Sequence, residues 1–480
     1  MQILTRLKGA SNKTILLFIL AAAALLRFTA LTHQSLWLDE LHTMNICDPA
    51  TTWSQLFDTL RCCDQHPPLY FVLQRLVFMG IGYGEWQARI LSAITGVACV
   101  YAIYHFGKEL LSERLGLTAA AITCVNMFNL NHSQEARGYA LLWLFTTLSY
   151  LFFIRLFKYQ KVRDAAFYVL TTLLMLYTHY FSLMAMCCQA ILGIIFLTSV
   201  ENAKRIRLLI IYLVSAVIIC LLYLPLLSFL KGVTNTNSFW IGAIRPLFFI
   251  DFYYEYFNNA VIIFSPLLLY FFFRAFRQFS LPRLAGDPLV LTGIFAFVSI
   301  FVAYLIPYVR SVKVVPMLVP RYTIIVLPSF IIAIAYGFEL VTKQKLRTWL
   351  LGIALLLSLA DIFFIKKYYS PRYAQFREMT QYMSSGHRAY PYINELCWWQ
   401  QTYYLNKYHY KGELLEGNKE QWVDSILSGC YKVDTFWIVG AHGDPKLETA
   451  KRCDLDTAYT ILKEKDFYGA WAQLYARKKD

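Results

Sequence analysis

The sequence predicts a multi-pass α-helical membrane protein of about eleven transmembrane helices, followed by a small extracytoplasmic α/β domain. Its 480 residues are 58% hydrophobic and only 16% charged, with a mean hydropathy of +0.45, whereas soluble domains carry about 25% charged residues. Apolar runs alternate with basic loops as far as residue 366, and polar residues dominate residues 367–480. Because the basic residues behind the net charge of +15 lie mostly between apolar runs, no nucleic-acid partner is expected.

The first apolar run, residues 14–30, is long enough at about 1.5 Å per residue to approach the ~30 Å core of a bilayer. It follows Arg6, Lys8 and Lys13, and its end makes a poor cleavage site for a signal peptidase. We therefore expect a retained signal anchor with the N-terminus in the cytoplasm.

Ten further apolar runs continue the transmembrane module, which is predicted to occupy residues 1–366. The predicted spans are residues 86–105, 117–130, 141–157, 165–177, 183–200, 208–230, 261–273, 288–307, a segment opened by Arg321 that ends near Lys343, and 349–365. Each run is judged by its length and by the polar residues that bound it.

Residues 69–80 are apolar but short for a span, and Gln74 and Arg75 interrupt them. If they crossed the membrane, every later basic loop would lie outside. If they lie at the interface, within a first external loop of residues 32–85, the loops are cytoplasmic and the C-terminal domain is outside. These basic loops are residues 108–114, 158–163, 204–207, 274–283 and 343–347. The positive-inside rule therefore favours the interfacial placement.

The C-terminal segment, residues 367–480, is predicted to form a small extracytoplasmic α/β domain. Helical patterns occupy residues 373–384 and 417–428, and a strand-like run occupies residues 435–440. About 110 residues are enough for a core of their own. The Gly-Ala-His-Gly sequence at residues 440–443 favours a tight turn over a ligand-facing loop.

The stretch from Ser35 to Tyr70 carries the leading candidates for chemistry. It reads S-L-W-L-D-E-L-H-T and closes with D-Q-H-P-P-L-Y, directly after the first predicted span. The adjacent Asp39 and Glu40, flanked by Trp37, are suited to act as a general base or as metal ligands, and a solvated acidic loop is the alternative. A divalent cation is compatible with this pair, but no ligand spacing requires a metal or another cofactor.

The predicted topology collects further ionisable side chains on the external face of the membrane. They are His42, His66, Glu85, Arg89, His132, Glu135, Arg137, His179, Arg245, Arg310, Lys313 and Arg321. Ionisable residues at span ends are costly and are candidates for function, and arginines bind phosphate in a bidentate manner. A site that combines carboxylates and arginines suits a phosphate-linked substrate presented from the bilayer.

Structural roles compete with functional ones for several of these residues. Glu135 and Arg137 could belong to an ordinary helix-capping set, and His179 could be a hydrogen-bonded turn residue. Arg321 could extend to lipid headgroups. His66 could simply fix a turn, because the proline that follows forces it into an extended conformation.

Taken in order, these motifs resemble the C-type (GT-C) glycosyltransferase superfamily. The ordered set is W-L-D-E, H-P-P-L-Y, E-W-x-x-R-I-L, S-Q-E-A-R-G-Y-A-L and a late P-R-Y. It covers residues 35–141 densely and then the site at Arg321. The branch that it resembles contains bacterial membrane enzymes related to protein O-mannosyltransferase and to the aminoarabinose transferase that modifies lipid A.

The resemblance implies a GT-C fold, a polyprenyl-phosphate sugar donor and inversion at the anomeric carbon. It maps the general base to Asp39, a substrate or metal contact to the neighbouring Glu40 of the predicted catalytic pair, and the donor-phosphate contacts to Arg89 and Arg321. Arg137 joins the donor-phosphate set, and the expected substrate contacts are Trp37, His66, Glu135, Tyr139 and His179. The aminoarabinose transferases have Lys before their Pro-Pro where this chain has Gln65-His66, which weakens lipid A as the acceptor.

The predicted function is transfer of a sugar from a polyprenyl-phosphate donor to a lipid, glycan or protein acceptor. A bacterial inner membrane with a periplasmic site is the expected location, and an endoplasmic reticulum membrane with a luminal site is the alternative. The competing function is a transporter or flippase of a lipid-linked glycan. Such a protein would carry charges at the midplane of two similar halves, whereas here the notable charges are predicted on one face.

Overall fold

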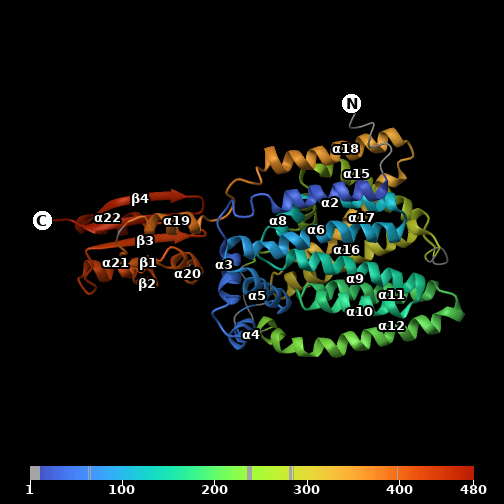
Figure 1. The fold of residues 1–480 in the computed structure, drawn as a ribbon, viewed down its shortest axis with the longest axis horizontal. Helices are drawn as coiled ribbons and strands as arrows, with labels where there is room; N and C mark the ends of the chain where they lie inside the picture. Colours follow the sequence, from blue (N-terminus) through green and yellow to red (C-terminus); the bar gives the residue numbers. More distant parts are fainter. Residues whose placement is uncertain are drawn as a thin grey trace. The chain divides into compact units, whose positions relative to one another are not determined.

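The computed structural model describes residues 11–62, 64, 66–234, 241–280, 284, 286–386, 388–396 and 398–479. The chain divides into two compact units, a helical unit and a sheet unit (Figure 1). The helical unit comprises Met1–Thr29, Ala50–Val77 and Arg89–Lys367, and the sheet unit comprises Ala30–Pro49, Phe78–Ala88 and Tyr368–Asp480. Two segments of the predicted first external loop therefore belong to the same unit as the C-terminal segment.

The helical unit is a set of apolar helices that share one continuous core. Its α-helices are α2 (Asn12–Phe28), α4 (Trp53–Cys62), α5 (Leu69–Ile81), α6 (Glu85–Leu110), α7 (Glu113–Cys124), α8 (Met127–Ser133), α9 (Tyr139–Tyr159), α10 (Val162–Leu176), α11 (Ser182–Ser199), α12 (Asn202–Tyr223), α13 (Leu227–Thr234), α14 (Phe248–Phe257), α15 (Val261–Arg277), α16 (Pro288–Lys313), α17 (Leu327–Leu340) and α18 (Gln344–Ala360). Short turns η1 (Leu224–Leu226), η2 (Asn258–Ala260), η4 (Tyr322–Val326) and η5 (Asp361–Ile365) connect or extend them. The first residues of α6 and the last of α5 fall in the sheet unit.

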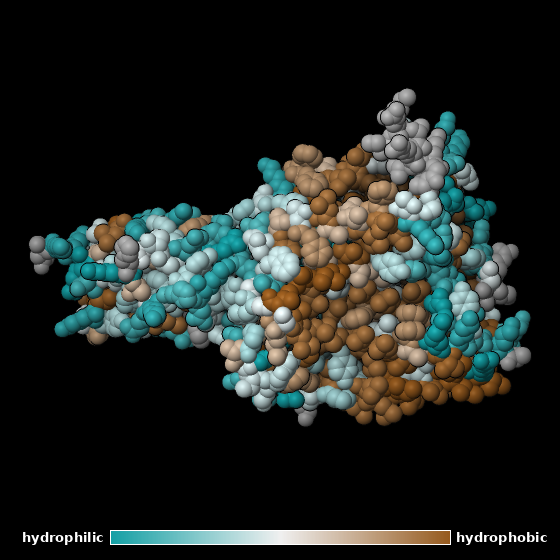
Figure 2. All heavy atoms as spheres, viewed as in Figure 1, coloured by the Kyte–Doolittle hydropathy of each residue, from teal (hydrophilic) through white to brown (hydrophobic). Residues whose placement is uncertain are grey.

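Eight helical segments of the described chain are long and apolar enough to cross a bilayer. They are Glu85–Leu110, Tyr139–Tyr159, Ser182–Ser199, Lys204–Leu230, Phe248–Arg277, Pro288–Lys313, Tyr322–Leu340 and Gln344–Ile365. Apolar side chains cover much of the visible surface of these helices (Figure 2). The multi-pass helical fold is confirmed, but the predicted count of eleven spans is not.

Three predicted spans fall short of this length. α2 has 17 residues and α10 has 15, and residues 117–130 form two helices, α7 and α8, instead of one. Asn126 separates these two because its side chain caps α8, accepting a hydrogen bond from the Asn129 backbone N–H at 2.8 Å. Asparagine favours helix caps over helix interiors, and average hydropathy does not register a single capping residue. α5, with 13 residues, spans only about 20 Å, and its interfacial placement stays a prediction.

A buried arginine of α2 holds the region where α7 ends and α8 begins. Arg27 is fully buried and donates to the carbonyl oxygens of Thr123 and Cys124 at 3.1 and 3.2 Å, and to Oδ1 of Asn129 at 2.7 Å. These carbonyls lie in the last turn of α7, where no later helical N–H is available, and the Thr123 carbonyl also accepts from the Asn126 backbone N–H at 3.3 Å. The Gln134 amide also donates to the Arg27 carbonyl at 2.9 Å. The C-terminal end of α2 thereby positions the turn that leads into α9.

The sheet unit is a five-stranded mixed sheet with helices. Its strands are β1 (Tyr392–Asn394), β2 (Leu414–Glu416), β3 (Thr435–Ala441), β4 (Tyr459–Phe467) and β5 (Ala470–Arg477), in the spatial order β2-β1-β3-β5-β4. Its helices are α3 (Leu38–Ile46), α19 (Phe376–Ser384), α20 (Trp398–Lys407), α21 (Lys419–Leu427) and α22 (Thr449–Ala458). β1 pairs in parallel with β2 and β3, whereas β5 pairs antiparallel with β3 and β4.

The predicted small C-terminal α/β fold is confirmed. The helical patterns at residues 373–384 and 417–428 correspond to α19 and α21, and the run at residues 435–440 is β3. β3 is buried along nearly its whole length, with Phe436 and Ile438 in the core. The predicted turn after β3 is present, and His442 and Gly443 have positive φ angles of 57° and 86° there.

Candidate active site

Turns at the ends of α9, α10 and α11 gather polar and aromatic side chains in the helical unit. They line a small pocket formed by His66, Tyr70, Phe71, Arg137, Gly138, Tyr139, Thr178 and His179. The backbone N–H of Leu69 donates to the Tyr177 carbonyl at 3.0 Å, which joins the start of α5 to the turn after α10. Four of the predicted site residues therefore lie together, although they are far apart in the sequence.

Asp64, His66 and Arg137 form a hydrogen-bonded row along this pocket. Oδ1 of Asp64 lies 2.8 Å from Nδ1 of His66, and Nη2 of Arg137 lies 3.3 Å from Nε2 of the same ring. A carboxylate accepts and a guanidinium donates, so Nδ1 of the ring carries the proton and Nε2 accepts. Asp64 and Arg137 are buried. The row therefore orients the His66 ring from both sides.

His179 lies between α10 and α11 and packs edge-on against His66, with ring centroids 5.3 Å apart. Its Nδ1 accepts a hydrogen bond from the Phe181 backbone N–H at 3.1 Å, so its proton resides on Nε2. Burial, and then the nearby His66, Arg137 and Arg321, hold the pKa of His179 well below its usual range. Nε2 has no hydrogen-bond partner among the described residues, which makes it a candidate donor to a ligand in the pocket.

We expect His179 to make the free energy of unfolding depend on pH. The unfolded chain binds a proton near pH ~6.5 that the folded chain excludes, so stability falls as the pH drops below that value, by up to about 1.4 kcal/mol per pH unit. The His179→Asn variant should show a shallower loss of thermal stability between about pH 7 and pH 5 in detergent. The exposed His409 provides the control His409→Asn. Equal slopes for His179→Asn and wild type would contradict this account of His179.

Arg321 approaches the same cluster from the start of η4. Its guanidinium carbon lies 6.0 Å from the ring centre of Tyr139 and 5.7 Å from that of Tyr322. The Tyr322 ring lies 5.1 Å from the His179 ring. Attraction between a guanidinium and aromatic faces fixes the position of the cation. Two arginines, Arg137 and Arg321, therefore lie near a histidine that burial keeps neutral.

Glu135 and Arg89 are buried but do not line the pocket. Oε2 of Glu135 lies 2.9 Å from Nδ1 of His132, and Oε1 accepts a hydrogen bond from Nδ2 of Asn131 at 2.6 Å. The His132 ring packs 5.0 Å from the Tyr139 ring. Glu135 thus has local partners at the end of α8, and direct substrate roles for Glu135 and Arg89 stay predictions.

Asp39 and Glu40 lie in the first turn of α3, within the sheet unit. Glu40 is fully buried, and its Oε2 accepts a hydrogen bond from the Trp37 backbone N–H at 3.2 Å. This contact satisfies one of the free backbone N–H groups at the start of α3. Asp39 is half-buried, and the helix N-terminus favours its negative charge. The two adjacent carboxylates therefore differ, and Asp39 is the stronger candidate for chemistry.

Trp37 packs inside the sheet unit. Its ring stacks on that of Tyr373 with centroids 4.8 Å apart and an interplanar angle of 16°. This aromatic contact joins the start of α3 to the C-terminal segment, so a substrate role for Trp37 stays a prediction. Across the described ranges, no three His, Cys, Asp or Glu side chains converge to hold a metal ion.

The tertiary structure added residues that sequence reasoning did not select for the site. Asp64, Tyr70, Phe71 and Tyr322 surround the predicted His66, Arg137, Tyr139, His179 and Arg321. The D-Q-H order of the first loop is a weak signal for the Asp64 contact. Aromatic residues are common in apolar runs, so Tyr70, Phe71 and Tyr322 offered no local signal.

Comparison with known proteins finds likenesses to glycosyltransferases in part of the sequence and in the fold. A family model for dolichyl-phosphate-mannose-protein mannosyltransferase matches residues 65–229. Apo ArnT from Cupriavidus metallidurans has a TM-score of 0.63 at 12% identity, covering 95% of this chain and 97% of that chain. ArnT bound to undecaprenyl phosphate has a TM-score of 0.58 at 13% identity, with the same coverage.

A third similar structure is the archaeal oligosaccharyltransferase AglB from Archaeoglobus fulgidus, in complex with an inhibitory peptide and a dolichol-phosphate. Its TM-score is 0.55 at 11% identity, covering 98% of this chain and 74% of that chain. No curated protein sequence matches the chain. At such low identities the structural matches establish a shared fold, and they confirm the predicted C-type fold class.

Proposed function

We propose that this protein is an inverting glycosyltransferase. The chain resembles the C-type membrane glycosyltransferases in sequence and shares their fold. It moves a sugar from a polyprenyl-phosphate donor to a hydroxyl of a lipid, glycan or protein acceptor. The observation that supports this most directly is the pocket lined by Arg137 and the neutral His179, where Arg321 lies beside the ring of the lining residue Tyr139. Such a pocket favours an anion.

The donor phosphate is the proposed occupant of this pocket. Guanidinium groups form short, charge-assisted hydrogen bonds to phosphate oxygens, and Arg137 and Arg321 supply two such groups. The Nε2–H of His179 adds a neutral donor. Tyr70, Phe71 and Tyr139 provide an apolar wall, which strengthens electrostatic contacts by limiting water. Arg89 is a third proposed contact to the phosphate, on the strength of the resemblance alone.

Asp39 is proposed as the general base. It takes the proton of the acceptor hydroxyl as the hydroxyl oxygen forms a bond to the anomeric carbon. The bond between that carbon and the phosphate oxygen breaks on the opposite side, which inverts the configuration. The leaving group departs as polyprenyl phosphate, and guanidinium contacts stabilise its developing negative charge. No general acid is then needed for its departure.

The proposed location is a bacterial inner membrane. The N-terminus would lie in the cytoplasm, and the sheet unit would lie in the periplasm. This orientation rests on the bias of lysine and arginine toward alternate loops. It puts the donor's sugar on the outer face, where acceptors of the cell envelope are available.

The test is sugar transfer by the purified full chain. A panel of polyprenyl-phosphate donors, radiolabelled in the sugar, is incubated with membrane extracts as the source of acceptors. We expect one donor to lose its label to an acceptor in an enzyme-dependent reaction, with the product's anomeric configuration inverted by NMR. If no donor is consumed and labelled lipid instead equilibrates across proteoliposomes, the protein is a transporter and the proposal is wrong.

A further inference from the structure

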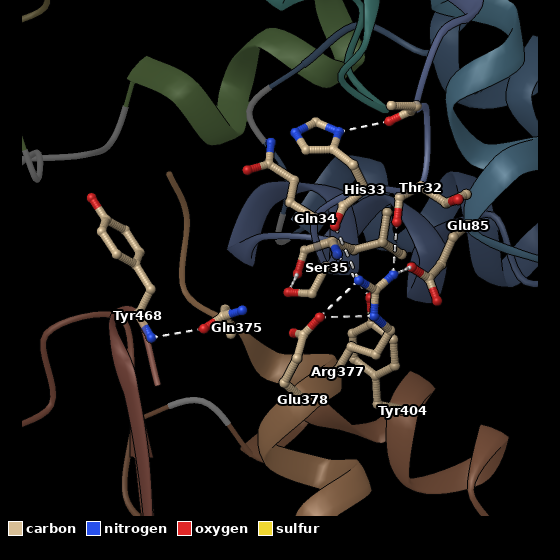
Figure 3. Close-up of polar contacts among 12 residues, drawn as sticks. Thr32, His33, Gln34, Ser35, Glu85, Gln375, Arg377, Glu378, Tyr404 and Tyr468 are labelled. Carbon is tan, nitrogen blue, oxygen red and sulfur yellow. Dashed lines mark hydrogen bonds and ion pairs between the residues drawn. The ribbon is translucent and has the colours of Figure 1, made fainter. Parts of the chain in front are cut away.

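Within the sheet unit, Arg377 of α19 joins the C-terminal segment to the first-loop segments, one of which carries Asp39. Its guanidinium donates to Oε2 of Glu85 at 2.7 Å and to the backbone carbonyl oxygens of Thr32 and His33 at 3.0 and 3.4 Å (Figure 3). It also donates to Oε1 of Glu378 at 2.7 Å. One side chain therefore contacts both first-loop segments of this unit, residues 30–49 and 78–88.

These contacts are sheltered from water. The side chain of Arg377 is 19% exposed and that of Glu85 is 5% exposed. Lys407 of α20 forms a second ion pair with Glu85. Ion pairs at the surface contribute little to the stability of a fold. A buried carboxylate that loses its partner is left as an uncompensated charge, and this destabilises the fold strongly. Glu85 is therefore held by two cations of the C-terminal segment.

α19 is itself fixed to the sheet. At its start, Oε1 of Gln375 accepts a hydrogen bond from the Tyr468 backbone N–H at 2.8 Å (Figure 3). The Gln375 backbone N–H donates in turn to the Tyr468 carbonyl at 2.9 Å. Tyr468 lies in the turn between β4 and β5. The position of Arg377 is therefore tied to the sheet through a pair of reciprocal hydrogen bonds.

The four residues after His33 continue this attachment toward α3. The Arg372 backbone N–H donates to Oε1 of Gln34 at 3.2 Å, the Ser35 hydroxyl donates to the Ala374 carbonyl at 2.9 Å, and the Leu36 backbone N–H donates to the Tyr404 hydroxyl at 2.7 Å. Trp37 then stacks on Tyr373. Each residue from Thr32 to Trp37 contacts the C-terminal segment, and Asp39 follows two residues later.

We propose that Arg377 is a positioning residue for sugar transfer and that the C-terminal domain serves to hold the acidic first loop in its working conformation. The inference rests on the proposed function, because it assigns the loop's Asp39 a catalytic role. Arg377 itself touches neither donor nor acceptor in this account. It fixes the backbone from which Asp39 projects.

The experiment combines amide hydrogen exchange with kinetics on the full chain. In Arg377→Gln, exchange in residues 30–49 should accelerate at least about tenfold, while β3 and β5 keep their protection. The kcat for sugar transfer should fall at least about tenfold with the donor's KM unchanged. Arg377→Lys keeps the positive charge but loses the planar fork of donors. It should therefore show intermediate exchange in residues 30–49 and an intermediate kcat. The exposed Arg388 gives the control Arg388→Gln, with wild-type behaviour.

Glu85→Gln serves as a second variant, because it breaks the same pair from the loop side and leaves α19 intact. It should accelerate exchange in residues 30–49 in the same direction. Wild-type protection of residues 30–49 in both Arg377→Gln and Glu85→Gln would overturn the proposal, and so would faster exchange with unchanged kcat. A wild-type protein that transfers no sugar would contradict the proposed function alone, since the exchange measurement does not depend on activity.

Discussion

Asp39→Asn is expected to lower the rate of sugar transfer by about 10²–10⁴-fold, the usual contribution of a positioned proton acceptor. Asparagine has nearly the same shape as aspartate but cannot take the acceptor's proton. The side chain lies half-buried in the first turn of α3, so the substitution should leave the helix in place. The loss of a negative charge at this helix end costs only about 0.3–1 kcal/mol.

The control for this variant is another carboxylate of the same loop. Asp58 is exposed on α4 and pairs with Arg61 at 3.2 Å, and we assign it no role in the reaction. Asp58→Asn should transfer sugar at the wild-type rate. Purified Asp39→Asn that is folded, by its thermal unfolding, and retains wild-type kcat would rule out Asp39 as the base.

Arg321→Ala is expected to raise the donor's KM about 10- to 100-fold, since a hydrogen bond to a charged group contributes about 1.5–3 kcal/mol. The guanidinium lies beside the rings of Tyr139 and Tyr322, which hold it in place. Arg321→Lys should give an intermediate KM, because an ammonium keeps the charge but loses the planar fork of donors. Initial rates over a range of donor concentrations measure the effect.

A cation from the preceding loop provides the comparison. Lys313 is exposed at the end of α16, so Lys313→Ala should leave the donor's KM unchanged. If Arg321→Ala also left the KM at its wild-type value, the phosphate contact would have to lie elsewhere. A raised KM in both variants would instead indicate general attraction of an anionic lipid by positive charge.

Much of the fold followed from local sequence patterns. A membrane span depends on the length of an apolar run, which is a one-dimensional property, and eight predicted spans agree with observed helices. α9 extends from Tyr139 to Tyr159, against the prediction of residues 141–157. One shortfall arose where a polar side chain changed the backbone, at Asn126 between α7 and α8, whereas α2 and α10 are single helices of 17 and 15 residues.

The candidate site was predictable as a set of residues but not as an arrangement. Sequence motifs selected His66, Arg137, Tyr139 and His179, which line one pocket. They did not reveal that Asp64 and Arg137 orient the His66 ring from its two sides. They also did not separate Glu40, which caps α3, from its neighbour Asp39.

The sequence by itself determined the multi-pass helical architecture, the small C-terminal α/β fold and the resemblance to C-type glycosyltransferases. Only the tertiary structure decided which distant segments meet. Trp37 stacks on Tyr373, and Arg377 binds the carbonyl of Thr32, across more than 300 residues of chain. Hydropathy and helical periodicity report each segment's own environment, whereas such contacts depend on how all the segments pack, and no local pattern encodes that.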